Sequence, residues 1–214
     1  MKRRQFNRTL AVAGALAAIN PFSVARAQAQ KLKVGVILPR SGTLGLIGQS
    51  CQKGADLAPG VIKEMLGVDL ELMNADFESN VDTARTRAER LIQEGAHVLV
   101  GPFDSGAATA IAQVAEQRGV PLIINIAAAP QITEQGYRFV FRNFQTAPEI
   151  VRNGLALIGV LLQNTGAHPQ TAVFMHVNDT FGQAMAQGIS ATLPSLKPSW
   201  VRDGSIAVIP LVIA

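Results

Sequence analysis

The sequence contains one cysteine and three histidines, and both scarcities exclude kinds of site. Cys51 has no partner for an internal disulfide, and its place among glutamine and glycine predicts a partly buried small apolar residue rather than a nucleophile. His97, His168 and His176 are scattered, with no cysteine or carboxylate at metal-ligand spacing. We therefore expect no metal and no other cofactor.

The chain also lacks the sequence motifs that are typical of enzyme active sites. The turn at 101–106 has no lysine after its second glycine and no spaced glycines, which excludes a phosphate loop and a dinucleotide turn. Ser41 and Ser105 have no histidine at an interpretable position for a hydrolase triad. Asp76 and Glu78 form a carboxylate pair, but their turn before a helix favours capping or solvation over acid–base chemistry. We expect a protein that is not an enzyme.

Acidic residues are absent from the first 27 positions, and this confines the positive charge of the chain to its start. The whole chain has 19 Lys and Arg against 15 Asp and Glu. Five of the basic residues precede Gln28, which leaves 14 basic against 15 acidic residues in the remainder. The basic balance therefore gives no support for a nucleic-acid partner.

The first residues have the layout of an export signal. A basic start precedes a mildly apolar run at 10–19, and small residues allow cleavage after Ala27 or Ala29. The run at 3–6 (RRQF) resembles a twin-arginine signal, although general secretion stays open. The apolar run is too short and too weakly hydrophobic for a permanent membrane span. We predict a signal peptide over 1–29 and a periplasmic location.

From residue 31 onwards, short apolar runs alternate with helical patterns. Four nearly continuous apolar strands with three helical patterns between them predict an α/β fold with a parallel sheet covered on both faces. We expect strands at 32–38, 68–74, 97–100, 121–126, 137–141 and 171–177, with 207–213 as one more candidate. We expect a helix at 49–57 that Pro59 breaks or kinks, followed by a second helical piece at 61–66.

The stretch 98–111 joins a buried strand to a helix through a polar turn. Ser105 or Asp104 is the expected N-cap, and the free amides and dipole of the helix N-terminus are suited to an anion. An ordinary strand–turn–helix joint that binds nothing fits this stretch as well.

Five motifs in order carry a family resemblance. They are the export signal, KVGVILPRSGTLGLIGQ, LVGPFDSGAATAIA, APQITEQGYRFVFR and VNDTFGQAMAQGI. Over residues 31 to about 197 the chain resembles the periplasmic substrate-binding proteins of ABC importers, of the branched-chain amino-acid (leucine/isoleucine/valine-like, type I) group. The resemblance implies two α/β lobes that close by a hinge on a small ligand, a permease partner in the inner membrane, and a monomeric full-length protein.

The resemblance divides the chain into a first lobe at 31–143 and, at 144–214, a crossover with an incomplete second lobe. We therefore expect the second part to pack poorly, to expose a sheet edge, and to leave ligand binding weak or absent. A ligand-sensing receptor of the same fold and a non-functional fragment stay open as alternatives to uptake.

The resemblance implies two ligand contacts at the start of the helix near 105. Ser105 matches the serine whose hydroxyl and amide hold an amino-acid carboxylate. Asp104 stands where relatives often have a neutral residue. Its charge would repel a carboxylate, so it either reorients the ligand or selects an amine.

The remaining expected contacts are apolar. Ala128, in the same loop as Ile126, stands where amino-acid binders have a threonine. Phe181 matches an aromatic, commonly tyrosine, that covers the ligand from the second lobe, although a core role for it is the alternative. Leu46 or Ile47 falls where an aromatic often lines the pocket. The lost hydroxyls predict a larger or more apolar ligand, such as an aromatic or aliphatic carboxylate or an amide.

Overall fold

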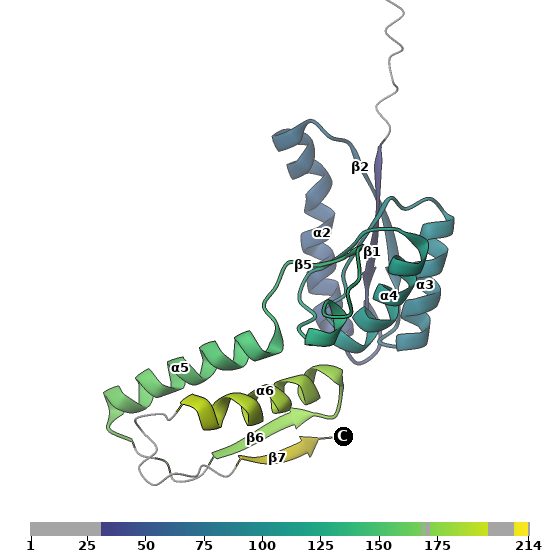
Figure 1. The fold of residues 1–214 in the computed structure, drawn as a ribbon. Coiled ribbons are helices and arrows are strands. Elements are labelled where there is room, and N and C mark those ends of the chain that lie inside the picture. The colour runs from purple at the N-terminus through teal and green to yellow at the C-terminus, as the bar shows by residue number, and fades with distance from the viewer. Residues whose placement is uncertain (1–30, 168, 170–171, 197–207, 214) are drawn as a thin grey trace, which may run out of the picture. The chain divides into compact units, whose positions relative to one another are not determined.

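The structure is a computed structural model that describes residues 31–167, 169, 172–196 and 208–213, and the predicted export signal lies outside them (Figure 1). Strands and helices alternate along the chain. The elements are β1 (Leu32–Leu38), α2 (Gly45–Leu66), β2 (Leu70–Asp76), α3 (Val81–Gln93), β3 (Val98–Val100), α4 (Ser105–Arg118), β4 (Leu122–Ile124), η1 (Pro130–Ile132), β5 (Val140–Arg142), α5 (Ala147–Thr165), β6 (Ala172–Val177), α6 (Thr180–Leu196) and β7 (Val208–Ile213).

The first five strands form one parallel sheet in the order β2-β1-β3-β4-β5. This confirms the predicted α/β class with a parallel sheet. β1 pairs with β2 along its whole length, from Leu32 opposite Leu70 to Leu38 opposite Asp76. The strands β3, β4 and β5 have three residues each, so they are shorter than the apolar runs that predicted them.

Side chains of the interior strand β1 alternate between two cores, which explains the helices on both faces. Val34, Val36 and Leu38 form a cluster with Cys51 of α2. Ile37 belongs to the larger cluster that α3 and α4 cover. Figure 1 shows α2 on one side of the strands and α3 and α4 on the other. Cys51 is partly buried, as predicted, and this burial raises the pKa of its thiol.

The helix α3 follows directly from its sequence. The Asn80 side chain accepts a hydrogen bond from the Thr83 amide at 2.9 Å, which caps the first turn. Ala84, Ala88 and Leu91 lie buried on one face, and they recur at the spacing of an amphipathic helix. The N-cap and the core face together account for the start of α3 and for the side that it buries.

Of the two expected effects of Pro59, the break is wrong, because α2 runs as one helix from Gly45 to Leu66 with Pro59 inside it, whereas the kink stays a prediction. A proline forfeits one backbone hydrogen bond and crowds the preceding turn, a local cost that does not end a helix by itself. The helix ends at Gly67, whose left-handed conformation closes the last turn. Because α2 begins four residues earlier than predicted, the connection after β1 is the short segment 39–44 rather than 39–48.

A second, two-stranded parallel sheet is made of β6 and β7. The helix α6 begins at Thr180, directly after Asp179. Among the β6 side chains, Val173, Met175 and Val177 are 63, 58 and 57 % exposed. The side chains on this face of β6 are thus largely exposed, while the expected incompleteness of the second lobe stays a prediction.

The helix α5 begins with a capping box and carries apolar side chains on its surface. The backbone amide and hydroxyl of Thr146 donate to the Glu149 carboxylate at 2.7 and 2.8 Å. Leu157 and Leu161 are 71 and 60 % exposed. Within the described residues, no helix combines the length and the apolar character that a bilayer crossing needs.

Candidate functional site

The loops that follow the strands of the first sheet meet at its carboxyl edge, because all five strands run in the same direction. Three of these loops matter here: 39–44 after β1, 101–104 after β3 and 125–129 after β4. Open parallel sheets place ligands at this edge. Gly101 lets the β3 loop approach β1 closely: its φ is +107°, and a Cβ there would lie 2.4 Å from the Ile37 carbonyl oxygen.

The N-terminus of α4 is capped by Asp104, the second of the two residues predicted for this role. The Asp104 carboxylate accepts a hydrogen bond from the Ala107 amide at 2.5 Å. Ser105 is the first residue of the helix, and its side chain is completely buried. Its hydroxyl accepts a hydrogen bond from the Ala129 amide at 3.4 Å. The amides that were expected to be open to an anion are thus partly taken by a carboxylate of the chain itself.

Asp104 lies close to a second capping carboxylate. Asp179 accepts a hydrogen bond from the Gly182 amide at 2.6 Å, which caps α6 in the same way. A Cβ on Gly106 would lie 3.6 Å from the Thr180 hydroxyl, so the first turns of α4 and α6 approach each other. Burial raises the pKa of Asp104, opposed by the amide hydrogen bonds that it accepts, and the Asp179 charge raises it further.

The loop after β4 is held from three directions. Ala127, Ala128 and Ala129 are 1, 1 and 0 % exposed. The Ala129 amide donates to Ser105, and the Ala128 carbonyl accepts from the Ala147 amide at the start of α5 at 2.8 Å. The third contact is a 2.6 Å hydrogen bond from Arg142 Nη2 to the Ala129 carbonyl. The structure therefore brings Ser105 and the segment around Ala128 together.

The other predicted contacts present apolar surface at or near this edge. Ile126, in the β4 loop, is 40 % exposed, and Phe181, in the first turn of α6, is 43 % exposed. Leu46 and Ile47 lie in the first turn of α2, with exposures of 81 and 52 %. Four of the predicted residues are thus accessible to a ligand, whereas the Ser105 and Ala128 side chains are covered.

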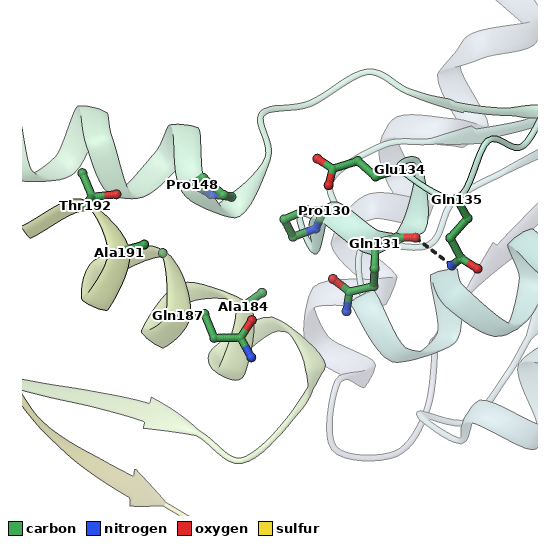
Figure 2. Close-up of a pocket in the computed structure, with 10 residues that line it drawn as sticks. Pro130, Gln131, Glu134, Gln135, Pro148, Ala184, Gln187, Ala191 and Thr192 are labelled. Atoms are coloured by element: carbon green, nitrogen blue, oxygen red, sulfur yellow. Dashed lines mark hydrogen bonds between the residues drawn. The ribbon is translucent and has the colours of Figure 1, made fainter. Parts of the chain in front are cut away.

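A hollow of about 500 Å³ lies beside this edge and was not predicted from the sequence. It is bounded by η1 and the residues that follow it, by Pro148 of α5 and by one face of α6. Figure 2 shows Pro130 and Gln131 facing Ala184 and Gln187 across it. None of the residues predicted to contact a ligand lines this hollow. Its walls come from three separate segments, so no local pattern could have indicated it.

Arg142 is a second feature without a predicted role, although it ends the quoted run APQITEQGYRFVFR. Its Nε and Nη1 atoms are buried and have no hydrogen-bond partner among the described residues. Burial lowers the pKa of Arg142, while the carboxylates of Glu134 and Glu149 act in the opposite direction. Within the described part of the chain, no group of three His, Cys, Asp or Glu side chains is arranged to hold a metal ion.

Comparison with known proteins gives consistent matches. Residues 31–207 match the family described as periplasmic binding protein. Leu/Ile/Val-binding protein homolog 8 of Brucella abortus (strain 2308) is 28% identical over 198 residues, which cover 84% of this chain and 48% of that protein. The chain thus spans about half the length of the curated relatives that it matches.

Solved structures share the fold. A solute-binding protein of an ABC transporter from R. palustris, in complex with benzoate, has a TM-score of 0.70 and 29% identity. The match covers 86% of this chain and 48% of that one. The leucine-binding protein LivK of Thermotoga maritima has a TM-score of 0.69 at 24% identity, over 85% of this chain and 49% of that one.

Proposed function

Because the chain belongs to the periplasmic binding protein family, we propose that it captures a small organic ligand in the periplasm for uptake by an ABC transporter. One observation carries this proposal. The loops after β3 and β4 interlock at the carboxyl edge of the first sheet, and the first turn of α6 approaches the same edge. A ligand at this place would be reached by groups from both sheets.

The surface at this edge favours an apolar ligand. Ile126 and Phe181 offer exposed apolar side chains, and Leu46 and Ile47 add more from α2. The buried Ala128 methyl group provides no hydrogen bond. A pocket with few polar anchors selects mainly by shape and apolar contact. We expect an aromatic or aliphatic carboxylate or an amide; the R. palustris relative was solved with benzoate.

The charge at the edge constrains how such a ligand is oriented. Asp104 and Asp179 place two carboxylates at the facing N-termini of α4 and α6. A ligand carboxylate beside them would be repelled, whereas an ammonium or amide N–H group would be attracted. An amide or ammonium ligand would therefore point its N–H donors towards Asp104, whereas a ligand carboxylate would lie away from Asp104 and Asp179.

Capture proceeds in this proposal by hinge closure. The segment 143–146 connects β5 to α5 and is the connection between the first sheet and the part that contains the second. Residues in such connections absorb the backbone rotation when two parts close on a ligand. The closed protein would then be recognised by a permease in the inner membrane. Binding rather than catalysis is the proposed activity, and the full-length protein is proposed to be a monomer.

A thermal-shift panel tests the ligand class. The panel contains leucine, isoleucine, benzoate, 4-hydroxybenzoate and benzamide, each added to the chain without its first 29 residues. We expect benzoate-like acids or benzamide to raise the melting temperature more than leucine does. Stabilisation by leucine without any response to the aromatic compounds would refute the apolar-ligand part of the proposal. Calorimetry with the most stabilising compound then tests the expectation that binding by this chain is weak, which a micromolar Kd would refute.

A further inference from the structure

The loop after β4 has no polar side chain in its central segment with which to fix its own conformation. Its residues 127–129 are all alanine and all buried, so the backbone groups of this segment depend on partners elsewhere. A buried carbonyl without a hydrogen bond costs free energy comparable to that of a lost hydrogen bond. The Ala129 carbonyl accepts two hydrogen bonds, one from the Ile132 amide of η1 at 3.3 Å and one from Arg142 Nη2 at 2.6 Å, and the second is short enough to be charge-assisted.

The Arg142 contact connects two parts of the molecule that ligand capture would use together. Arg142 is the last residue of β5, directly before the connection to α5. The neighbouring carbonyl of Ala128 accepts a hydrogen bond from Ala147, the first residue of α5. The same three-alanine segment is therefore held by the residue before the connection and by the residue after it.

The environment of Arg142 shows that the contact with Ala129 is its main compensation for burial. Nε and Nη1 have no partner among the described residues, so burial of the guanidinium is only partly offset by hydrogen bonds. Glu134 and Glu149 lie close enough to favour its charged form. Of these, Glu149 is already engaged by the amide and hydroxyl of Thr146.

We propose that Arg142 is a positioning residue: it holds the loop after β4 in the conformation that presents Ile126 to the ligand, and it links this loop to the first turn of α5. The ligand part of this statement rests on the proposed function. The positioning part concerns only the backbone of residues 127–129 and of Ala147. Hydrogen exchange can therefore test it without a ligand.

The experiment compares Arg142→Ala and Arg142→Lys with the wild-type chain. The control is Arg138→Ala, which removes an exposed guanidinium from the same segment and leaves the Arg138 backbone contact with Glu116 intact. We measure exchange of the Ala129 and Ala147 amides, with Ile111 in the core of α4 as the reference. Binding of benzoate and leucine is measured on the same samples.

We expect Arg142→Ala to speed exchange at Ala129 and Ala147 by about tenfold, the equivalent of one charge-assisted hydrogen bond, while Ile111 stays unchanged. Free guanidinium ion at low millimolar concentration should slow this exchange again. Arg142→Lys should have an intermediate effect, because a lysine supplies the charge but not the planar fork. Arg138→Ala should behave like the wild type.

Unchanged exchange at both amides in Arg142→Ala would overturn the proposal. Equal acceleration at Ala129, Ala147 and Ile111, without rescue by guanidinium, would also overturn it, because it would indicate general destabilisation. If exchange changes locally as expected but the wild-type chain binds neither probe, the positioning role stands and the proposed function fails for these ligands. If the wild type binds and Arg142→Ala binds equally well, Arg142 does not position a ligand loop.

Discussion

At the residue scale, Asp104 affects the stability of the folded state in two opposite ways. Its carboxylate caps α4 through the Ala107 amide, as an N-cap should. Burial and the Asp179 charge nevertheless raise the pKa of Asp104 above its ordinary value. A carboxyl group with a raised pKa binds its proton more tightly in the folded than in the unfolded chain. Its charged form therefore destabilises the folded state at neutral pH, and this penalty disappears as the pH falls from the folded pKa towards the unfolded value of about 3.9.

We predict opposite effects for two substitutions of Asp104. Asp104→Asn keeps a capping oxygen and removes the charge, so the free energy of unfolding at pH 7 should rise. Asp104→Ala removes the cap as well and should lower the free energy of unfolding by about 1 kcal/mol. Urea unfolding between pH 4 and 7 measures both. The penalty that grows with pH in the wild type should be absent from Asp104→Asn. Equal losses for the two variants at pH 7 would show that the charge itself is needed.

At the scale of elements, one carboxylate connects the loops that follow β1 and β2 through hydrogen bonds. Asp76 accepts hydrogen bonds from the amides of Arg40 at 2.8 Å, Glu78 at 2.9 Å and Ser41 at 3.4 Å. The Ser79 hydroxyl adds a bond to the Ser41 carbonyl at 2.8 Å. Burial acts to raise the pKa of Asp76, but the hydrogen bonds outweigh it and hold this pKa below its ordinary value. The turn before α3 therefore fixes the loop that leads to Leu46 and Ile47.

Loss of the Asp76 charge should destabilise the protein and change its response to acid. Because the folded pKa is lowered, the contribution of Asp76 is complete above the unfolded value of about 3.9 and is lost as the pH falls through the folded pKa. Asp76→Asn should lower the free energy of unfolding at pH 7 by about 1 to 2 kcal/mol. Below pH 4, the difference in the free energy of unfolding between this variant and the wild type should become smaller. Glu64→Gln, at an exposed position of α2, is the matched control, and a gap constant with pH would contradict this account.

The close approach of α2 to the end of β1 depends on Gly48. A Cβ at this position would lie 1.9 Å from the Pro39 carbonyl oxygen, whereas a Cβ on Gly54 in the same helix meets nothing within 4 Å. Gly48→Ala should therefore lower the free energy of unfolding by about 1 to 3 kcal/mol through overpacking. Gly54→Ala should raise it by about 0.5 to 1 kcal/mol through helix propensity. Thermal unfolding of both variants measures these two changes in stability. Similar changes for Gly48→Ala and Gly54→Ala would contradict the close packing at Gly48.

The elements show which properties of the fold are local and which are not. The helix α3 could be predicted because Asn80 caps it and its core face repeats every three to four residues. The extent of α2 could not be predicted, because Pro59 is a strong local signal for a helix end and yet lies inside this helix. Asp104 or Ser105 was predicted as a cap from spacing alone. The burial of Ser105 and the contact of Arg142 with Ala129 depend on approaches between separate segments, which spacing does not encode.

At the scale of the whole molecule, the chain combines a five-stranded parallel sheet with a two-stranded sheet that follows one connection. Four of the five motifs behind the family resemblance fall on the loops after β1 and β3, on the run from the β4 loop to β5, and on the first turn of α6; the fifth, the export signal, lies outside the described residues. These are the places from which an open α/β fold presents its ligand contacts. The exposed apolar side chains of Ile126, in the loop after β4, and of Phe181, in the first turn of α6, are the basis of the proposed ligand class.

The central claim is ligand capture at the carboxyl edge of the first sheet, with Phe181 of α6 as a proposed contact. Ligand-observed saturation-transfer NMR tests it most directly, since the method also detects weak binding. The account predicts saturation transfer from the chain to benzoate, a strong reduction of this signal in Phe181→Ala, and no reduction in Leu57→Ala, which removes an exposed leucine of α2. Absence of transfer to benzoate, benzamide, leucine and isoleucine alike, or an equal signal from Phe181→Ala and the wild type, would contradict the account.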